Sequence, residues 1–334
     1  MANVVTEAFS ATYGGANLNE IFYEPTFRSD EILANYRVIP NVKHKMNVFA
    51  AAPLTKIVAA HGGCSSDLTG GAFDLSDKTI EAGRCRVALE QCAEEFFGTY
   101  IEELYRSGVD AMNVEGTEIG DMMVKRTVDG IGQDIVRLAW GGNTADADAD
   151  YKTLNGWMKL MAAETVIEEA GTVGSVTSTD AINLLRAVFD GAPAALQQVA
   201  AGEKKMFVTP RLFNAYLANL EGGSSDLAYA SQKDGVMKVS FRGVQLVPMY
   251  EWDTILTDTD PTLFTDAADE ECNDGVCYIA SQNLIIGTDV TDPQSQLKMW
   301  YDDKDEKVLV RSYFKLGVQY LFSSLTQWGI IASA

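Results

Sequence analysis

The sequence predicts an elongated α+β protein, and three features lead to this prediction. A candidate helix of unusual length covers residues 117–140, and a candidate strand of unusual length covers 308–322. Between them, from about 151 to 280, shorter helical and strand patterns alternate. A long helix needs an equally long surface to lie on, and a hairpin built on the long strand supplies one. We therefore expect an elongated slab with a compact α+β unit inserted into it.

The long helix is predicted from apolar residues that recur every three or four positions. This stripe consists of Val124, Val128, Ile131, Ile135 and Leu138. Asp134 and Arg137 are three positions apart and would form an ion pair on the helix surface. Thr117 can cap the start, and Gly141 with Gly142 can provide a left-handed C-terminal cap. At 1.5 Å per residue the helix would be roughly 36 Å long.

The long strand is predicted from alternation, with one apolar face interrupted only by Ser312 and one polar face. The apolar face carries Val308, Val310, Phe314, Leu316, Val318, Tyr320 and Phe322, and the polar face carries Arg311, Tyr313, Lys315 and Gln319. At about 3.3 Å per residue the run would span roughly 50 Å. Gly317 leaves an alternative open, in which two ordinary strands meet at a break.

Residues 1–46 show little periodicity but contain aromatic side chains that favour burial. These are Phe9, Tyr13, Phe22, Tyr23, Phe27 and Tyr36. The segment is either an arm that lies on a neighbouring molecule or a strap over the core of its own chain.

Residues 48–86 predict a long two-stranded excursion with a flexible tip, because glycine pairs at 62–63 and 70–71 lie between strand-like runs. Two strands alone are marginally stable in water. The excursion must therefore rest on another surface, in this molecule or in the next.

The compact unit is predicted from shorter patterns. The expected helices cover 156–170, 179–201 with a break at Pro193, and 210–220 starting at Pro210. The expected strands cover 205–209, 236–241, 244–249, 276–287 and 297–301. Arg242 and Gly243 would form the turn of a hairpin. The acidic segment 258–274 is expected to be an exposed loop.

Composition restricts the possible functions. Of 334 residues, 47 are acidic and 26 are basic, which gives a net charge of −21. Direct binding of nucleic acid or anionic membranes is disfavoured, because such binding relies on Lys and Arg. No apolar run is long enough to span a membrane and the N-terminus lacks the features of a signal peptide, so the cytoplasm is the default expectation. The charge suits solubility at high concentration, or a surface that lies near packed DNA without adhering to it.

We predict no catalytic, cofactor-binding or metal site. The cysteines are Cys64, Cys85, Cys92, Cys272 and Cys277, an odd number that favours reduced thiols in a chain without an export signal. The alternating acids of 146–150 resemble the start of a calcium loop, but Tyr151 replaces its glycine and Trp157 its glutamate. His61 and Cys64 are close in sequence but have no carboxylate placed to orient them. Phosphate loops and dinucleotide fingerprints are absent from the sequence.

Several stretches, taken in order, have a known counterpart. They are the aromatic arm, the loop that ends at 73–92, the helix from Thr117 into Leu-Ala-Trp-Gly-Gly-Asn143, the segments 151–157, 207–216 and 283–289, and the closing strands. In this order the chain resembles the major capsid proteins of tailed bacteriophages, whose HK97-like fold is shared with encapsulin shells. The resemblance covers nearly the whole chain and rests on the order of the parts.

The resemblance implies the following division. Residues 1–46 would be an N-terminal arm, 47–92 an extended loop, 93–145 and 281–334 a peripheral domain with the spine helix and the closing strands, and 146–280 an axial domain. The protein would be a structural component of the virion and not an enzyme. Its copies would assemble in the host bacterial cytoplasm, as pentamers and hexamers, into an icosahedral capsid around double-stranded DNA. Expected partners are other copies of itself, scaffold and portal proteins and possible decoration proteins.

Two rival functions remain open at this point. An encapsulin compartment would use the same fold around a protein cargo. A soluble acidic cytoplasmic enzyme, with acidic loops lining a carboxylate site, would show a discrete pocket and stabilisation by a small molecule. Some relatives cross-link their subunits through a lysine and an asparagine. Lys56 and Lys78 lie in or near the extended loop, but no spacing identifies an asparagine partner, so this activity is not assigned.

Overall fold

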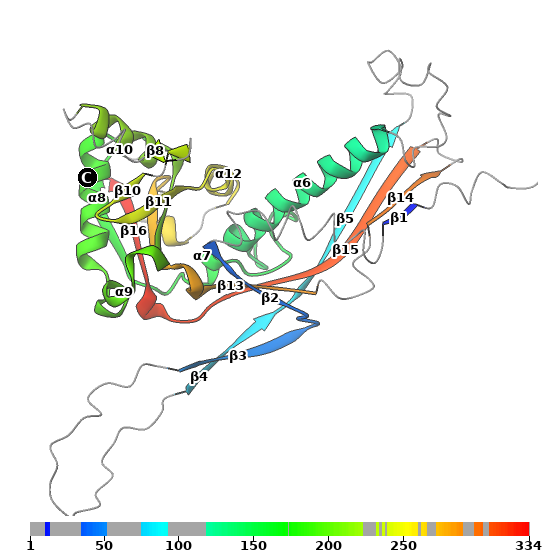
Figure 1. Cartoon of the computed structure of the whole chain (residues 1–334), viewed down its shortest axis with the longest axis horizontal. Helices are drawn as coiled ribbons and strands as arrows, with labels where there is room; N and C mark the ends of the chain where they lie inside the picture. Colours follow the sequence, from blue (N-terminus) through cyan, green and yellow to red (C-terminus); the bar gives the residue numbers. More distant parts are fainter. Residues whose placement is uncertain are drawn as a thin grey trace, which may run out of the picture.

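The computed structural model describes residues 11–13, 35–51, 75–92, 118–172, 174–222, 232–233, 236–237, 239–259, 262–265, 272–289, 297–302 and 307–333. These residues form two six-stranded sheets and two small two-stranded sheets, together with helices, which confirms the α+β class. Figure 1 shows a compact unit from which a long sheet and helix α6 (Glu118–Gly141) extend, while a hairpin projects in another direction. The elongated shape agrees with the prediction.

The long sheet is built on β15 (Lys307–Tyr320), which continues through Gly317. The prediction of one long strand is therefore confirmed, and the alternative of two strands is wrong. The other strands of this sheet are β1 (Ala11–Tyr13), β2 (Arg37–Pro40), β5 (Gly83–Cys92), β13 (Leu284–Thr288) and β14 (Leu297–Asp302). The apolar face of β15 is buried, and Ser312, which interrupts it, is only 1% exposed. The strand ends two residues before the predicted Phe322.

Helix α6 covers the apolar face of β5 and β15, as expected. Ile131, Ile135 and Leu138 are buried in one cluster with apolar residues of both strands. Asp134 Oδ1 lies 3.0 Å from Arg137 Nη2, which confirms the predicted ion pair. The predicted cap Thr117 and the side chains of Val124 and Val128 lie outside the described residues.

The predicted left-handed cap at Gly141 and Gly142 is wrong, because neither residue has a positive φ. Both glycines instead allow close packing. A Cβ on Gly141 would lie 2.6 Å from Cγ2 of Ile255, and one on Gly142 would lie 2.6 Å from the carbonyl oxygens of Leu138 and Leu154. The C-terminal end of α6 is thus pressed against neighbouring segments.

The compact unit contains the second sheet, in the order β10, β11, β7, β12, β16, β6. Its strands are β6 (Val166–Gly171), β7 (Lys204–Val208), β10 (Ser240–Phe241), β11 (Val244–Pro248), β12 (Gly275–Ala280) and β16 (Thr326–Ser333). The division implied by the resemblance groups all of 281–334 with the long strands, but β16 lies between β12 and β6. The reason is burial: Trp328, Ile330 and Ile331 are at most 1% exposed and require cover on both faces.

Helices lie on the second sheet or at its junction with the long sheet. They are α7 (Trp157–Leu160), α8 (Ser178–Gly191), α9 (Ala194–Gln198), α10 (Pro210–Gly222) and α12 (Glu251–Asp258). The break at Pro193 and the start at Pro210 are confirmed. The helix predicted over 156–170 is wrong beyond Leu160, because 166–171 form β6 in parallel pairing with β16. The β-branched pair Val166 and Ile167 suits a strand.

The turn at Arg242 and Gly243 is confirmed, with φ values of 47° and 83°. Before it, β9 (Val236–Met237) pairs with β8 (Gln232–Lys233) and not with β11. Arginine rarely adopts a positive φ. Here its guanidinium group lies 2.5 Å from Asp190 Oδ1 and 5.1 Å from the ring centroid of Phe189, and these contacts offset the strain.

The single strand predicted over 276–287 is wrong, because the chain passes from β12 in one sheet to β13 in the other. Asn283 lies at the crossing and is 2% exposed. Its Nδ2 donates to the carbonyl oxygen of Phe322 at 2.8 Å, and its Oδ1 accepts from the amide of the same residue at 2.8 Å. This side chain therefore joins two crossover segments that lie far apart in sequence.

The acidic segment 258–274 is not simply an exposed loop. Leu263 and Phe264 are at most 2% exposed, and Asp274 at the other end is 2% exposed. Phe264 packs on Trp252 with a centroid distance of 5.8 Å. The apolar pair anchors the segment, although its sequence is rich in acids.

An aromatic cluster joins the long sheet to the compact unit. It contains Tyr36, Trp140, Trp157, Phe207, Trp252, Phe264 and Trp328, all less than 9% exposed. Trp140 Nε1 donates to the Tyr36 hydroxyl at 3.1 Å, and β2 pairs with β13. Residues 35–42 therefore lie on their own core, as the strap hypothesis predicts, whereas 45 and 46 are exposed and already belong to strand β3 (Lys45–Ala51). Of the earlier residues only 11–13 are described, in a pairing with β14.

Candidate assembly surface

A projecting hairpin is the part of the described chain that its own core covers least. It consists of β3 (Lys45–Ala51) and β4 (Leu75–Glu81), which pair antiparallel along their whole length. The predicted two-stranded excursion is thus confirmed where it is described, whereas its tip, residues 52–74, lies outside the described residues. In Figure 1 the hairpin runs below the compact unit, in a direction away from α6.

The end of the hairpin that contains Lys45, Ile80 and Glu81, called the root below, is held in place by a small apolar cluster. Ile80 of β4 is fully buried and packs with Val42 and Ile285, which are 1% and 0% exposed. Gln319 Nε2 of β15 donates to the Thr79 carbonyl oxygen at 2.9 Å. The root therefore belongs to the core of the long sheet.

Two glycines allow the backbone at the root of the hairpin to lie close to β15 and to the segment around Thr153. A Cβ on Gly317 would lie 2.6 Å from the Glu81 carbonyl oxygen, and one on Gly83 would lie 2.4 Å from the Thr153 carbonyl oxygen. Real Cβ atoms do not come this close to backbone oxygens. Gly317 is thus present in the long strand because the hairpin crosses it there, and not because the strand breaks.

Three polar side chains fasten one face of the hairpin to the body. Lys78 Nζ lies 3.4 Å from the ring centroid of Tyr320, a cation–π contact. The Tyr320 hydroxyl donates to Glu164 Oε1 at 2.9 Å. Burial lowers the pKa of Lys78 while Glu164 opposes that shift, and burial together with the bond to Glu164 raises the pKa of Tyr320 to about 12. Lys78 is thus held within its own chain; Lys56 lies outside the described residues.

The distal part of the hairpin exposes apolar side chains. Phe49 is 70% exposed and Leu75 is 64% exposed. Phe49 pairs with Asp77, and Leu75 pairs with Ala51, so all four share one face of the ribbon. A two-stranded ribbon with such a face gains little stability from its own contacts. Its apolar face has the character of a contact surface.

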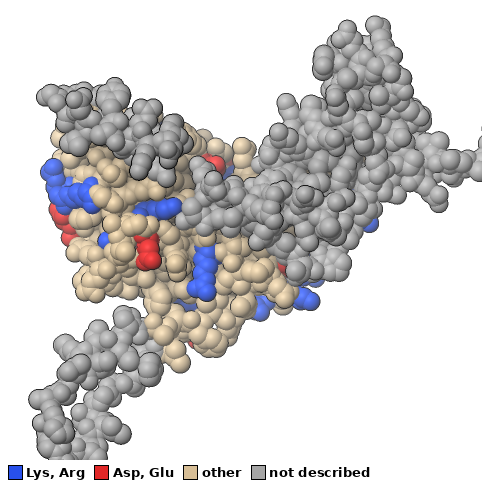
Figure 2. All heavy atoms as spheres, in the orientation of Figure 1, with Lys and Arg blue, Asp and Glu red and all other residues tan. Residues whose placement is uncertain are grey.

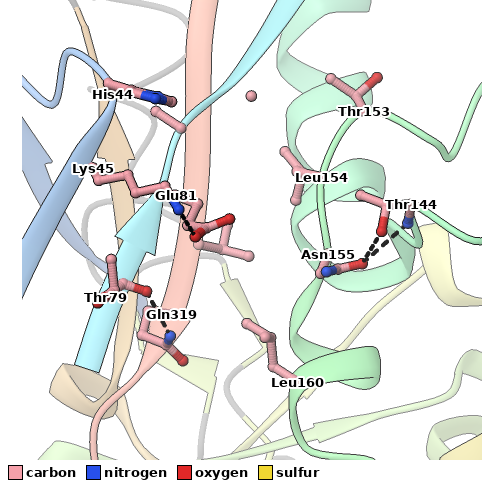
Figure 3. A pocket seen from close by; sticks show the side chains of 13 residues that line it. His44, Lys45, Thr79, Glu81, Thr144, Thr153, Leu154, Asn155, Leu160 and Gln319 are labelled. Atoms are coloured by element: carbon pink, nitrogen blue, oxygen red, sulfur yellow. Dashed lines mark hydrogen bonds and ion pairs between the residues drawn. The ribbon is translucent and has the colours of Figure 1, made fainter. Parts of the chain in front are cut away.

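A cavity of about 320 Å³ lies beneath the root, between the hairpin and the segment 144–160. Figure 3 shows His44, Lys45 and Glu81 on the hairpin side, facing Asn155 on the other wall. Lys45 forms an ion pair with Glu81, and Asn155 Oδ1 accepts from Thr144 Oγ1 at 2.9 Å. The polar groups of the walls thus bond mainly to each other on their own side. The cavity separates the two walls and leaves room beneath the hairpin.

Among the residues that the structure describes, those that sequence analysis considered for chemistry do not converge. Cys85, Cys272 and Cys277 are buried, and burial raises the pKa of Cys85 to about 12. His61 and Cys64 lie outside the described residues. Asp148 N donates to Asp146 Oδ1 at 2.9 Å, so these acids organise their own loop. Within the described part of the chain, no three metal-ligating side chains cluster, and no helix is long and apolar enough to cross a membrane.

The charge of the surface is dispersed on the face drawn in Figure 2. Basic and acidic side chains of the described residues are scattered over the compact unit, among many uncharged ones. A groove for a phosphate backbone would need basic groups along one track. The visible part of this face does not show such a track.

No protein-family model matches the sequence, and no curated protein matches it. Solved structures do match. The procapsid of satellite phage P4, in a structure that includes the size determination protein Sid, has a TM-score of 0.56 at 9% identity, over 95% of this chain and 99% of that one. The capsid of a native GTA particle has a TM-score of 0.53 at 10% identity, over 92% and 90%. The capsid of Myoviridae phage XM1 has a TM-score of 0.52 at 11% identity, over 91% and 92%.

This chain has a phage capsid fold. The match extends over nearly the full length of both chains, so it includes the long sheet, α6 and the compact unit together. The resemblance inferred from the order of the sequence segments is confirmed at the level of fold.

Sequence reasoning missed the residues that define the hairpin as a surface. Leu75 lies in a short alternating run and Phe49 in the continuous apolar run 48–51, and neither pattern reveals which face remains uncovered. Their partners Asp77 and Ala51 become neighbours only through pairing of β3 with β4. One signal was available: a two-stranded excursion with apolar residues on it needs a second surface.

Proposed function

We propose that this chain is the major capsid protein of a tailed bacteriophage, and that its copies assemble through pentamers and hexamers into an icosahedral shell around double-stranded DNA. The protein then acts by forming contacts with copies of itself, and it has no catalytic role. Its site of action is the virion capsid, after assembly in the bacterial cytoplasm. Scaffold, portal and decoration proteins are further proposed partners.

One observation carries this proposal: the hairpin of β3 and β4 presents Phe49 and Leu75 on a face that the described chain does not cover. Exposing a Phe and a Leu together is unfavourable in a monomer, since each would gain roughly 1.5–3 kcal/mol on full burial. A neighbouring copy offers that burial. The phage capsid fold supports this reading, because the matching structures are assembled capsids.

We infer the same division into domains that the resemblance implies, with one change. The arm, the extended loop, the peripheral domain with α6 and β15, and the axial domain would have separate roles in the shell. Since β16 lies in the second sheet, we propose that residues 326–333 act with the axial domain. The net charge of −21 suits an inner surface along which DNA can slide.

The test is to express the chain alone and with candidate scaffolds, and to examine it by sedimentation velocity and negative-stain microscopy. Shells, tubes, or rings of five and six copies are the expected result. A monomer or dimer at every salt and scaffold condition would refute the proposal. Particles filled with a folded protein in place of DNA after expression in the native host would indicate an encapsulin compartment.

A truncation tests the role of the N-terminal segment. Because Tyr36 and β2 belong to the core, the deletion should end at residue 34 and not at 46. We expect a soluble, folded subunit that no longer closes shells. Shells of normal size and yield from this truncation would show that the segment is not an assembly arm.

A further inference from the structure

Strand β5 forms a long edge of the long sheet. All ten of its residues pair antiparallel with β15, and among the described residues it pairs with no other strand. Figure 1 shows β5 beside β15 where both run away from the compact unit. The edge strands of the second sheet are shorter, since β10 has two residues and β6 has six. β5 is therefore the longest edge strand in the described part of the chain.

The free edge of β5 can accept another strand. In an antiparallel pair, alternate residues direct their amide and carbonyl groups to the partner, and the others direct them outward. Proteins usually protect such an edge by a proline, a bulge, a short strand or charged side chains. β5 contains no proline, and its ten pairs with β15 follow one another without a bulge. Charged side chains are thus the protection that β5 retains.

The two faces of β5 differ in character. On the face toward α6, Leu89 pairs with Val310, which is 1% exposed, yet Leu89 itself is 48% exposed. The cover that buries β15 thus leaves an apolar side chain open at the edge. The opposite face consists of exposed residues, which are Arg84, Arg86, Ala88 and Glu90.

The sequence of β5 is complementary to itself in antiparallel orientation. If two copies of β5 lie side by side with Ala88 opposite Ala88, Glu90 of each copy lies opposite Arg86 of the other. Arg84 then lies diagonally across from Glu90, within reach of a long side chain. On the other face, Leu89 lies opposite Val87, so its exposed apolar surface gains an apolar neighbour. All charges of β5 on the outer face therefore meet opposite charges.

Other registers satisfy these side chains less well. A pairing centred on Arg86 would place that arginine opposite itself, which is destabilising. A pairing centred on Val87 would set Glu90 opposite Arg84, but it would bring the two copies of Arg86 diagonally together. The register centred on Ala88 keeps the arginines apart and has the smallest side chain at its centre.

A second copy of the chain suits this edge better than a nucleic acid does. Glu90 lies 3.3 Å from Lys307 but its side chain is still 66% exposed, so it is open to a second cation. Phosphates offer only acceptors, whereas a strand edge alternates donors and acceptors. A phosphate backbone would also be repelled by Glu90 and by the net charge of −21. A strand complementary to itself instead gives both copies the same contact, as a two-fold interface requires.

We propose that β5 pairs antiparallel with β5 of a second copy across a two-fold axis, centred on Ala88, so that two long sheets become one continuous sheet. This inference rests on the proposed function and assigns residues to one contact between copies in the shell. Backbone hydrogen bonds supply the affinity of such a strand addition. The pairs of Arg86 with Glu90, and of Leu89 with Val87, set its register.

The first test reads the register with Ala88→Cys. In the proposed pairing the two Cα atoms at this position are about 4.5–5.5 Å apart, which permits a disulfide. Mild oxidation of assembled particles should therefore give a covalent dimer on non-reducing gels. The controls are the natural chain, which has five cysteines, and Tyr313→Cys, exposed on the same face but one strand further from the edge. Well-formed particles in which Ala88→Cys gives no more dimer than the controls would overturn the proposal.

The second test exchanges the charges within one chain. Arg86→Glu and Glu90→Arg each place like charges opposite each other, so each should raise the protein concentration needed for assembly at least about tenfold. The combined variant restores opposite charges and should recover most of the assembly. Lys298→Glu, exposed on the neighbouring strand β14, is the control for the change in net charge and should have a much smaller effect. A combined variant as defective as the single variants would contradict the pairing.

The contact and the proposed function fail in different ways. A natural chain that forms no shells, tubes or rings under any condition refutes the proposed function. Normal shells without the Ala88→Cys cross-link refute only the β5 contact. A cross-linked dimer that never builds larger particles supports the strand pairing and refutes the shell.

Discussion

The compact unit and the projecting hairpin differ in how far they bury their own apolar side chains. In the compact unit, strands β7 and β12 are buried at every position, and helices cover the sheet. In the hairpin, only one residue of β4, Ile80, is fully buried, while Phe49 and Leu75 remain exposed. The compact unit is therefore complete as a folded body. The hairpin leaves an apolar face that a second surface could cover, and for this reason we propose that it is the part of the chain that serves assembly.

If the body of the protein is self-sufficient, the largest loss of stability should come from its aromatic centre. Trp140→Ala removes a fully buried ring that contacts five other aromatic rings at centroid distances between 4.9 and 6.4 Å. We expect a loss of about 3–5 kcal/mol in the free energy of unfolding, measured by urea denaturation. Trp300→Ala, at a half-buried position, should cost much less. Similar losses for both would contradict the central role of Trp140.

The junction between body and hairpin should respond to added volume at Gly317. Gly317→Ala would place a Cβ 2.6 Å from the Glu81 carbonyl oxygen, so we expect a loss of about 1–3 kcal/mol and a displaced hairpin root. Amide exchange of residues 78–82 would report the displacement. Gly132→Ala in α6 meets nothing within 4 Å and should stabilise the protein, since alanine favours helix. A neutral Gly317→Ala would show that the root is loosely held.

The hairpin face should affect assembly with little effect on folding. Phe49→Asp adds a charge at a side chain that is 70% exposed, so the free energy of unfolding should change by less than about 0.5 kcal/mol. Assembly, followed by light scattering, should require about tenfold more protein or more. Ser76→Asp places the same charge on the other face of the ribbon and is the control. Unchanged assembly by Phe49→Asp would exclude this face from the subunit contact.

A smaller effect is expected from a buried carboxylate in the compact unit. Burial raises the pKa of Asp274 although Arg211 Nη1 lies 3.4 Å from its Oδ2. A pKa above the unfolded value means that the folded state holds the proton more tightly. The stabilisation is therefore complete below the unfolded value of about 3.9 and is lost as pH rises through the folded pKa.

Asp274→Asn removes this titration. The difference in unfolding free energy between the natural chain and this variant should fall with rising pH, by about 1.4 kcal/mol for each unit of pKa shift. Denaturation at several pH values between 4 and 7 measures it. Asp190→Asn, at an exposed ion pair, is the control. A difference that is flat, or rises with pH, would show that Arg211 outweighs the cost of burial.

How far the sequence predicts this fold depends on the length of each pattern. The helix over 117–140 and the strand over 308–322 each repeat their period several times, so α6 and β15 appear close to where they were expected. The helix predicted over 156–170 ends at Leu160, and residues 166–171 form β6 instead, because Val166 and Ile167 favour a strand and β16 supplies its partner. For the candidate surface, the sequence predicted a two-stranded hairpin that must rest on another surface, but not which of its residues are exposed.

The sequence by itself determined the long elements, the break at Pro193, the turn at Gly243 and the order of parts that resembles a phage capsid protein. Each of these depends on neighbours within a few positions, where sterics and periodicity act directly. Only the tertiary structure decided that β16 joins the second sheet, that Asn283 fastens the crossover and that Gly317 allows the hairpin to cross. These features depend on residues that are tens to hundreds of positions apart, and no local pattern encodes which distant surfaces will meet.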